Sequence, residues 1–350
     1  MIVSFVVSLV LMVIIMAIGN KISLRSAQDL IAIQSTHLRP TSRLGGVAIL
    51  TGIVIGLFLG NFQLGAVLIV ISCAPIFLIG LLEDLTGKIS AKKRMLGAVF
   101  SALLASLLNE AYIYSIDIWF FDIFLVFIPF AVAFTVLSSC GAVNSFNLID
   151  GVNGFSGGMS MCIAVVLGLI CETYDEVMLS HLCFLIAVSI IPFLLFNFPF
   201  GLVFLGDAGA YVLGHLLCWI AIVLLYENPE ISAWALLLMF FWPITETLLS
   251  VVRRLKLKVP SGAPDNLHYH QLLMQALQIN NKEKEFFNKW SNPITTLVLL
   301  PISTVPIFLS ILFIENNLAS LALYLFFATL FVISYLVLSK KIKKLAVQKR

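Results

Sequence analysis

Residues 144–158 read NSFNLIDGVNGFSGG, a polar and glycine-rich stretch in a chain that is otherwise largely apolar. Apolar runs lie on both sides of it, at 122–140 and from 158 to 171. A turn of this kind separates two apolar helices, and the same alternation along the chain predicts the fold. A plain connection does not need so many Asn, Asp and Ser side chains, so the stretch is also a candidate functional site.

The composition is typical of an integral membrane protein. Of the 350 residues, 61% are hydrophobic and 11% are charged, and the mean hydropathy is +1.07. An α-helix needs about 20 apolar residues to cross the hydrocarbon of a bilayer, whereas barrel strands would be short and alternating. The long continuous runs therefore predict an all-α polytopic membrane protein, with one domain over residues 1–350. The net charge of +3 does not indicate a nucleic-acid partner.

Eleven apolar runs are candidate membrane-spanning helices. They cover residues 2–19, 45–60, 64–82, 95–109, 122–140, 158–171, 179–197, 210–226, 233–252, 294–314 and 318–338. The run at 95–109 is the weakest candidate, because it is shorter than the thickness of a bilayer requires.

The distribution of basic residues predicts which side of the membrane each loop occupies. All 21 Lys and Arg residues lie in 20–44, 83–94, 253–290 and 339–350, which are on one side if there are eleven spans. Basic loops face the cytoplasm. We therefore expect an N-terminus outside and a C-terminus in the cytoplasm.

Four groups of polar residues lie in or beside the predicted cytoplasmic loops. They are Glu83-Asp84 at the end of the third run, the stretch 144–153, Asp207 before the eighth run, and His268 with His270 after the ninth. Charged groups near a membrane span are costly, so several on one face suggest a shared ligand. Each also has a structural interpretation, such as a helix cap for Asp207 or an ordinary acidic loop for Glu83-Asp84.

Asn147 and Asp150 are three residues apart, close to one helical turn, so their oxygens can point the same way. Amide and carboxylate oxygens suit Mg²⁺, whose coordination is usually completed by water and substrate phosphates. A structural helix break is the alternative. The residues together favour a cytoplasmic, metal-assisted site for a phosphorylated substrate.

Neither the histidines nor the cysteines have a pattern typical of zinc. His268 and His270 have no cysteine near them in the sequence, and the six cysteines are scattered through apolar runs. We predict no disulfide and no zinc site. Phosphate binding, or orientation of a leaving group, suits this pair of histidines in a basic loop better.

Five segments in this order resemble the polyprenyl-phosphate N-acetylhexosamine-1-phosphate transferases of glycosyltransferase family 4. They are RPTSRLGGVAIL from Arg39, GLLEDLTGKISAKKRML from Gly80, NSFNLIDGVNG from Asn144, NFPFGLVFLGDAGA from Asn197 and DNLHYHQLL from Asp265. The family includes the enzymes that start O-antigen, teichoic acid and capsule synthesis, and the phospho-MurNAc-pentapeptide translocase. The resemblance implies transfer of a sugar 1-phosphate from a UDP-sugar to undecaprenyl phosphate, with Mg²⁺ as cofactor (Mn²⁺ as an option) and UMP as product.

The resemblance also implies roles for individual residues. Asn147 and Asp207 match metal-coordinating positions. Asp84 and Asp150 match catalytic or substrate-positioning acids, with Glu83, also a predicted catalytic residue, in the paired-acid motif beside Asp84. The substrate-binding positions that it implies are Asn197 and Phe204 for the uracil, His268 and His270 for the phosphates, and Asn153.

Three departures from the family pattern bear on the branch. Glu83 replaces an aspartate, Asn153 replaces a second aspartate, and Asn266 and Gln271 replace the outer residues of the histidine motif. They favour a polysaccharide-initiating enzyme over the pentapeptide translocase. A transporter of an anionic substrate and a non-catalytic binding protein are the alternatives from other classes. The partners that we predict are the two substrates and a bacterial plasma membrane, with a homodimer as an option.

Overall fold

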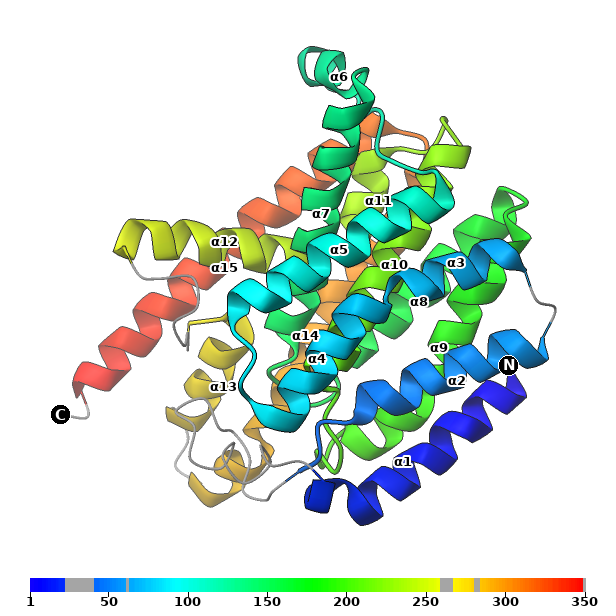
Figure 1. Ribbon diagram of the computed structural model, residues 1–350. Helices are drawn as coiled ribbons and strands as arrows, with labels where there is room; N and C mark the ends of the chain where they lie inside the picture. Colours follow the sequence, from blue (N-terminus) through cyan, green and yellow to red (C-terminus); the bar gives the residue numbers. More distant parts are fainter. Residues whose placement is uncertain (23–40, 61–62, 259–266, 280–283, 349–350) are drawn as a thin grey trace.

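The computed structural model describes residues 1–22, 41–60, 63–258, 267–279 and 284–348, and within these ranges the elements are all helices (Figure 1). They are α1 (Ile2–Ile22), α2 (Gly45–Leu59), α3 (Leu64–Ser72), α4 (Ala74–Thr86), α5 (Ala91–Asn109), α6 (Trp119–Leu125), α7 (Ile128–Ile149), α8 (Phe155–Thr173), α9 (Val177–Asn197), α10 (Gly206–Glu227), α11 (Ala233–Met239), α12 (Phe241–Leu257), α13 (Tyr269–Ile279), α14 (Lys284–Leu312) and α15 (Asn317–Gln348). The prediction of an all-α fold is confirmed.

Among the described residues, seven helices are long and apolar enough to cross a membrane, or up to eight if one bent pair is a single span. Two shorter apolar helices cover Ile2–Ile18 and Gly45–Leu59. The predicted run at 95–109 lies on α5, which begins with three basic residues. The chain is thus a multi-pass membrane protein, while eleven spans and the sides of the termini stay predictions.

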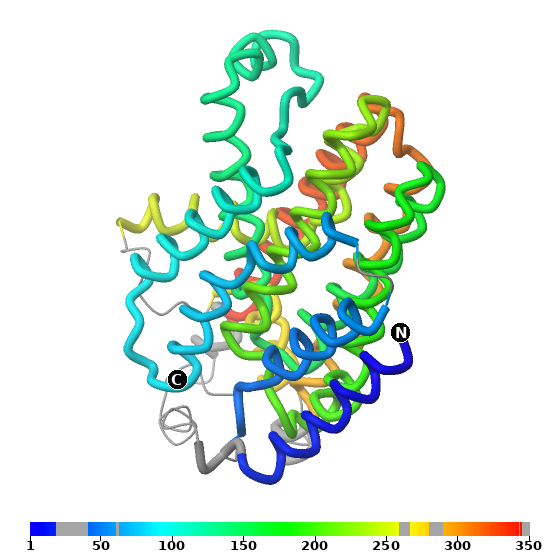
Figure 2. The backbone as a smooth tube through the Cα atoms, turned by 45° about the vertical axis from the view of Figure 1, so that its right-hand side comes forward, coloured from blue at the N-terminus to red at the C-terminus, as the bar shows by residue number. Residues whose placement is uncertain are grey.

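The predicted run at 64–82 is divided at Cys73 between α3 and α4, which together count as one candidate span. Two further predicted runs are not single helices either. The run at 233–252 breaks at Phe240, where α11 and α12 meet at an angle of 84°. The run at 122–140 is divided between α6 and α7, and α6 stands apart from the bundle in Figure 2. In both cases a proline, Pro243 or Pro129, lies in the first turn of the second helix. Proline has no N–H to continue a preceding helix but fits a first turn, which explains both boundaries.

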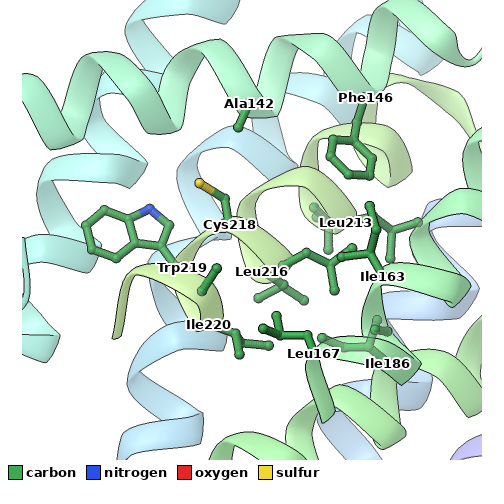
Figure 3. Close-up of a cluster of buried hydrophobic side chains, with 14 of the residues drawn as sticks. Ala142, Phe146, Ile163, Leu167, Ile186, Leu213, Leu216, Cys218, Trp219 and Ile220 are labelled. Atoms are coloured by element: carbon green, nitrogen blue, oxygen red, sulfur yellow. The ribbon is translucent and has the colours of Figure 1, made fainter. Parts of the chain in front are cut away.

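Helix α10 is the centre of the bundle. Its apolar span is buried on all sides, as expected of a helix that is hydrophobic all round. Figure 3 shows side chains from α7, α8 and α9 packed around its middle: Ala142, Phe146, Ile163, Leu167 and Ile186 surround Leu213, Leu216, Trp219 and Ile220. Helix α10 is therefore held on several sides by its neighbours, and Asp207 lies in its first turn.

Two short segments, 42–46 and 203–205, run side by side in parallel next to the start of α10. The N–H of Phe204 donates to the carbonyl of Ser42 (2.8 Å), and the N–H of Gly45 donates to the carbonyl of Phe204 (2.9 Å). This pairing places the segment that precedes α2 directly beside the first turn of α10.

Gly46 allows α2 and α10 to touch through their backbones. A Cβ atom on Gly46 would lie 2.2 Å from the Cα atom of Gly209 and 2.3 Å from its nitrogen. Small residues permit such close helix contacts in membranes. The contact leaves no room for any side chain at position 46.

We predict that Gly46→Ala destabilises the protein by about 1–3 kcal/mol, because the methyl group must push two backbones apart. The measurement is thermal unfolding of the purified protein in detergent. Gly141→Ala on α7 is the matched control, since its Cβ would meet nothing within 4 Å. Equal melting temperatures for Gly46→Ala and the wild type would contradict the assigned contact.

Candidate active site

Three predicted acids lie at helix ends that meet at one end of the bundle. Asp84 is near the C-terminal end of α4, Asp150 directly follows α7, and Asp207 is in the first turn of α10. This is the end of the bundle opposite α6, and α13 with its histidines also lies there (Figure 1). The fold thus brings Asp84 and His268, which are more than 180 residues apart in the sequence, to the same end of the bundle.

Asp84 caps the start of α10. Its two carboxylate oxygens accept the N–H groups of Asp207 (2.9 Å) and Ala208 (2.8 Å). Free N–H groups and the helix dipole make the first turn of a helix favourable for a negative charge. Gly206 has φ of 78°, and a Cβ there would lie 2.6 Å from an Asp84 oxygen. Asp84, which is fully buried, therefore fixes the position of Asp207.

Two arginines neutralise the buried carboxylates. Arg43 lies 3.2 Å from Asp84 through Nε and 3.1 Å from Asp207 through Nη2, and Arg94 Nη1 lies 2.6 Å from the other Asp207 oxygen. The sequence analysis did not single out either arginine. Both arginines could have been predicted, because buried carboxylates need counter-charges and because both arginines lie in segments that resemble the family.

Glu83 has a different position from its neighbour Asp84. Its carboxylate accepts the N–H of Ile89 at 2.7 Å, and its carbonyl accepts the N–H of Gly87. Glu83 thus holds the turn between α4 and α5, and this turn leads to Arg94. Its predicted catalytic role remains a prediction, and the observed bonds describe a residue that positions the turn.

Asp150 lies in a strongly perturbed environment. Burial raises its pKa well above 3.8; Arg43 opposes the rise, while Asp207 and Asp84 add to it. A carboxyl group with a raised pKa beside other charges is typical of a proton-transfer site. Asn147, in the last turn of α7, is partly exposed, so its amide is accessible on the same stretch of chain.

Asn153 fastens three segments together. Its side-chain N–H donates to the carbonyl of Pro199 (2.9 Å), its backbone N–H donates to Asn292 Oδ1 (2.8 Å), and its carbonyl accepts the hydroxyl of Thr296 (2.6 Å). An ionised aspartate has no N–H to give to Pro199. The amide at this position, where the family has an aspartate, is therefore explained by a hydrogen bond that only the amide can make.

Asn197 also joins the turn after α7 to the loop before α10. Its side-chain oxygen accepts the N–H of Gly154, and its side-chain N–H donates to the carbonyl of Val203 (2.8 Å). Its buried amide thus positions the turn after α7. Phe204 is held through its backbone beside residues 42–45, with its side chain partly exposed. The uracil contacts of both residues stay predictions.

The two predicted histidines form a parallel pair. The rings of His268 and His270 are 5.8 Å apart between centroids and 4° from parallel. A Cβ on Gly151 would lie 2.1 Å from His270 Nε2, so the pair packs directly against the turn that carries Asp150. Burial lowers the pKa of His270 to about 4. Asn266 of the same motif lies outside the described residues.

Glu246, on α12, is a further member of the site that the sequence analysis missed. It is buried, and one of its oxygens lies 3.5 Å from His268 Nδ1 and 3.7 Å from His270 Nδ1. In the sequence it follows an apolar stretch with no motif around it. Its only signal was an acid inside a predicted span, which is costly enough to suggest a function.

The predicted ligands fit a hard cation. Mg²⁺ is usually bound by one or two carboxylates together with substrate phosphates, and Asp207 and the amide of Asn147 supply oxygen donors of this type. Within the described part of the chain, no group of three or more His, Cys, Asp or Glu residues is placed to hold a metal by itself.

Comparison with known proteins gives a consistent result. Residues 66–225 match the model of glycosyl transferase family 4. A probable undecaprenyl-phosphate N-acetylglucosaminyl 1-phosphate transferase of Bacillus subtilis is 27% identical over 280 residues, 78% of this chain and 77% of that protein. The undecaprenyl-phosphate alpha-N-acetylglucosaminyl 1-phosphate transferases of Yersinia pestis and Escherichia coli K12 are 27% and 26% identical. Each match covers 66% of this chain and 65% of the relative.

We predict that Asn153→Asp lowers stability by about 1–3 kcal/mol, because the donor to Pro199 is lost and a carboxylate faces a carbonyl oxygen. Thermal unfolding in detergent measures the effect. Asn109→Asp is the control, since that amide bonds only the Ala105 carbonyl of its own helix. If Asn153→Asp is as stable as the wild type, the structural explanation of this amide is wrong.

Proposed function

We propose that the chain belongs to glycosyl transferase family 4, whose model matches residues 66–225, and that it carries out a sugar-phosphate transfer. The protein transfers an N-acetylhexosamine 1-phosphate from a UDP-sugar to undecaprenyl phosphate and releases UMP. The product is the lipid-linked first sugar of a cell-surface polysaccharide such as O-antigen, capsule or exopolysaccharide. The relatives are named for the N-acetylglucosaminyl form of this reaction, which makes UDP-N-acetylglucosamine the first donor to test.

One observation carries the proposal: two buried carboxylates, Asp84 and Asp207, are held by Arg43 and Arg94 at the end of a bundle of membrane helices. A lipid phosphate reaches such a place through the membrane, and a nucleotide sugar reaches it from water. Reactants held at one point gain much of their rate from orientation. Transfer between a lipid and a water-soluble donor needs a site of this kind.

In the proposed reaction, an oxygen of the lipid phosphate attacks the β-phosphorus of the UDP-sugar. The bond from that phosphorus to the bridging oxygen breaks, and UMP leaves with the bridging oxygen. Asp150, with its raised pKa, takes or orients the proton of the lipid phosphate, while Asp84 keeps Asp207 in place. His268 and His270 orient the diphosphate from the side of α13.

We propose that Asn147 and Asp207 hold Mg²⁺. When bound, the ion supplies positive charge that stabilises the charge developing on the diphosphate. Arg43 and Arg94 each bind one oxygen of Asp207, so a cation on Asp207 would require at least one of these arginines to turn away from it. Phe204 and Asn197 remain the proposed contacts of the uracil ring.

The test is a transfer assay with purified protein, undecaprenyl phosphate, Mg²⁺ and a panel of labelled UDP-sugars. We expect UMP release together with label in the lipid, loss of both with a chelator, and recovery with Mg²⁺. Turnover with UDP-MurNAc-pentapeptide alone would favour the pentapeptide translocase instead. A folded preparation that transfers no sugar phosphate would refute the enzyme and favour the binding protein or the transporter.

For the topology we propose eleven spans in a bacterial plasma membrane, with the N-terminus outside and the site facing the cytoplasm. The support is the confinement of all Lys and Arg residues to four stretches of the sequence. Glu227 and Lys88 are both exposed on the protein surface, so a cysteine at either position can react. In intact cells, a membrane-impermeant thiol reagent should label Glu227→Cys, which we place outside, but not Lys88→Cys, which we place in the cytoplasm. Unmodified protein corrects for its native cysteines. Labelling of both positions from the same side contradicts the topology.

The raised pKa of Asp150 predicts the shape of the pH profile. A base acts as the carboxylate, and this form is lost as the pH falls through a pKa that lies well above 3.8. We expect kcat/KM to fall on the acidic side at a pH above the usual aspartate range. Asp150→Asn should lower kcat/KM about 100-fold or more and remove this limb.

Asp175→Asn is the control for this experiment, because Asp175 is exposed and belongs to a turn between α8 and α9. It should keep the wild-type rate and the wild-type profile. A profile for Asp150→Asn that retains the acidic limb would assign the limb to another group and remove Asp150 from the proton transfer.

A further inference from the structure

Glu246 is a buried acid, and each of its carboxylate oxygens accepts a hydrogen bond. It lies on α12, a few residues after the 84° bend, and is 3% exposed. One oxygen accepts the backbone N–H of Tyr269 (2.6 Å), and the other accepts the indole N–H of Trp242 (3.1 Å). A carboxylate buried among aromatic rings is costly unless it has such partners.

Both histidines present the same ring nitrogen to this carboxylate. His268 Nδ1 and His270 Nδ1 lie 3.5 Å and 3.7 Å from the same Glu246 oxygen, and the two rings are within 4° of parallel. An acceptor beside Nδ1 favours the proton on that nitrogen and leaves Nε2 with its lone pair. The tautomer of a histidine is commonly set by the partner of its other nitrogen.

The opposite edge of one ring faces the active-site turn. His270 Nε2 is the atom that a Cβ on Gly151 would touch at 2.1 Å. Gly151 directly follows Asp150, so the carboxylate of Glu246 and the acid of the turn lie on opposite sides of the imidazole. His270 Nε2 is buried and has no hydrogen-bond partner among the described residues.

We propose that Glu246 is a positioning residue of the transfer site, which holds His268 and His270 in parallel with Nδ1 protonated and Nε2 directed at the substrate diphosphate. This inference rests on the proposed function and adds to it a residue that acts through the two histidines. In this arrangement the rings accept hydrogen bonds, or take up a proton, at Nε2 during the departure of UMP.

The charged groups around the pair support an orienting role. Besides Glu246, they are Arg253 on α12 and Asp150 in the turn after α7, with the neutral hydroxyl of Tyr335 on α15 beside Arg253. Arg253 donates to the carbonyl of Leu267 (3.0 Å) and to the hydroxyl of Tyr335 (2.7 Å), which anchors the loop before the histidines. These two bonds of Arg253 hold the loop, and Glu246 is the acid that faces the two Nδ1 atoms.

Burial keeps His270 neutral near pH 7. Its pKa is lowered to about 4, mainly by burial, although Glu246 acts in the opposite direction. A neutral imidazole has two tautomers, and only one of them accepts a hydrogen bond at Nε2. The carboxylate therefore decides which nitrogen of the neutral ring faces the substrate.

The substitution that separates orientation from folding is Glu246→Gln. The amide oxygen of glutamine can still accept the N–H of Tyr269, so this backbone contact is retained. This oxygen stays beside the two Nδ1 atoms but carries no negative charge, so it favours a proton on Nδ1 less strongly than the carboxylate does. The NH₂ group takes the place of the oxygen that accepts the indole N–H of Trp242, and it cannot accept that bond. We expect a kcat about 10- to 100-fold lower, a KM for the UDP-sugar within a few-fold of the wild type, and partial recovery of kcat in Glu246→Asp.

The control is Glu227→Gln, the same substitution at an exposed position at the end of α10. It should leave kcat unchanged. A wild-type kcat for Glu246→Gln overturns the proposal. A loss of kcat that Glu246→Asp does not recover at all, accompanied by a large fall in melting temperature in both variants, also overturns it, because the residue is then structural.

A second measurement does not depend on turnover. In ¹⁵N-histidine solid-state NMR of the full chain in lipid bilayers, the wild type should show His268 and His270 with a proton on Nδ1. His268→Asn and His270→Asn assign the signals. In Glu246→Gln these signals should move to the Nε2-protonated form or to a mixture, and unchanged tautomers overturn the proposal.

The two measurements also separate this inference from the proposed function. If the wild type transfers no sugar phosphate, the proposed function fails, and the NMR experiment still decides whether Glu246 orients the histidines. If the wild type is active and the tautomers do not respond to Glu246→Gln, the function stands and the inference fails.

Discussion

The need to neutralise two buried carboxylates at one helix start organises this protein. Asp84 of α4 accepts two N–H groups from the first turn of α10, and Asp207 of that turn faces two arginines. In a membrane protein such charges are stable only with partners. The partners come from the segment before α2 and from the start of α5. A single electrostatic cluster thus joins four parts of the chain around α10.

The loops near this cluster are held by side chains for which the sequence predicted catalytic or substrate-binding roles. Asn153 and Asn197 bond the turn after α7 to the loop before α10, and Glu83 holds the turn that leads to Arg94. Each of these bonds stabilises the place where the proposed reactants meet. Preorganised groups of this kind need no rearrangement during a reaction. The polar residues of the site therefore include both reacting groups and the groups that position them.

The structure explains why this chain departs from the family pattern at Asn153. The amide donates to Pro199, and a carboxylate cannot. The turn has one negative charge fewer, while Asp150 keeps a raised pKa from its burial and from the nearby Asp207 and Asp84. The bend between α11 and α12 similarly has a local cause in Pro243, and its consequence is distant: it brings Glu246 to the histidines of α13.

The sequence by itself determined the class of fold and most of the candidate site. Apolar runs of bilayer length can only be helices, and Asn147, Asp150, Asp207 and the histidines belong to segments that resemble one family. Only the tertiary structure decided that Arg43 and Arg94 neutralise Asp207, that Glu246 faces the histidines, and that three apolar runs are each divided between two helices. The physical reason is that hydropathy acts within a segment of the chain. Ion pairs and helix caps instead join residues that are far apart in the sequence, and the sequence does not show that they are close in space.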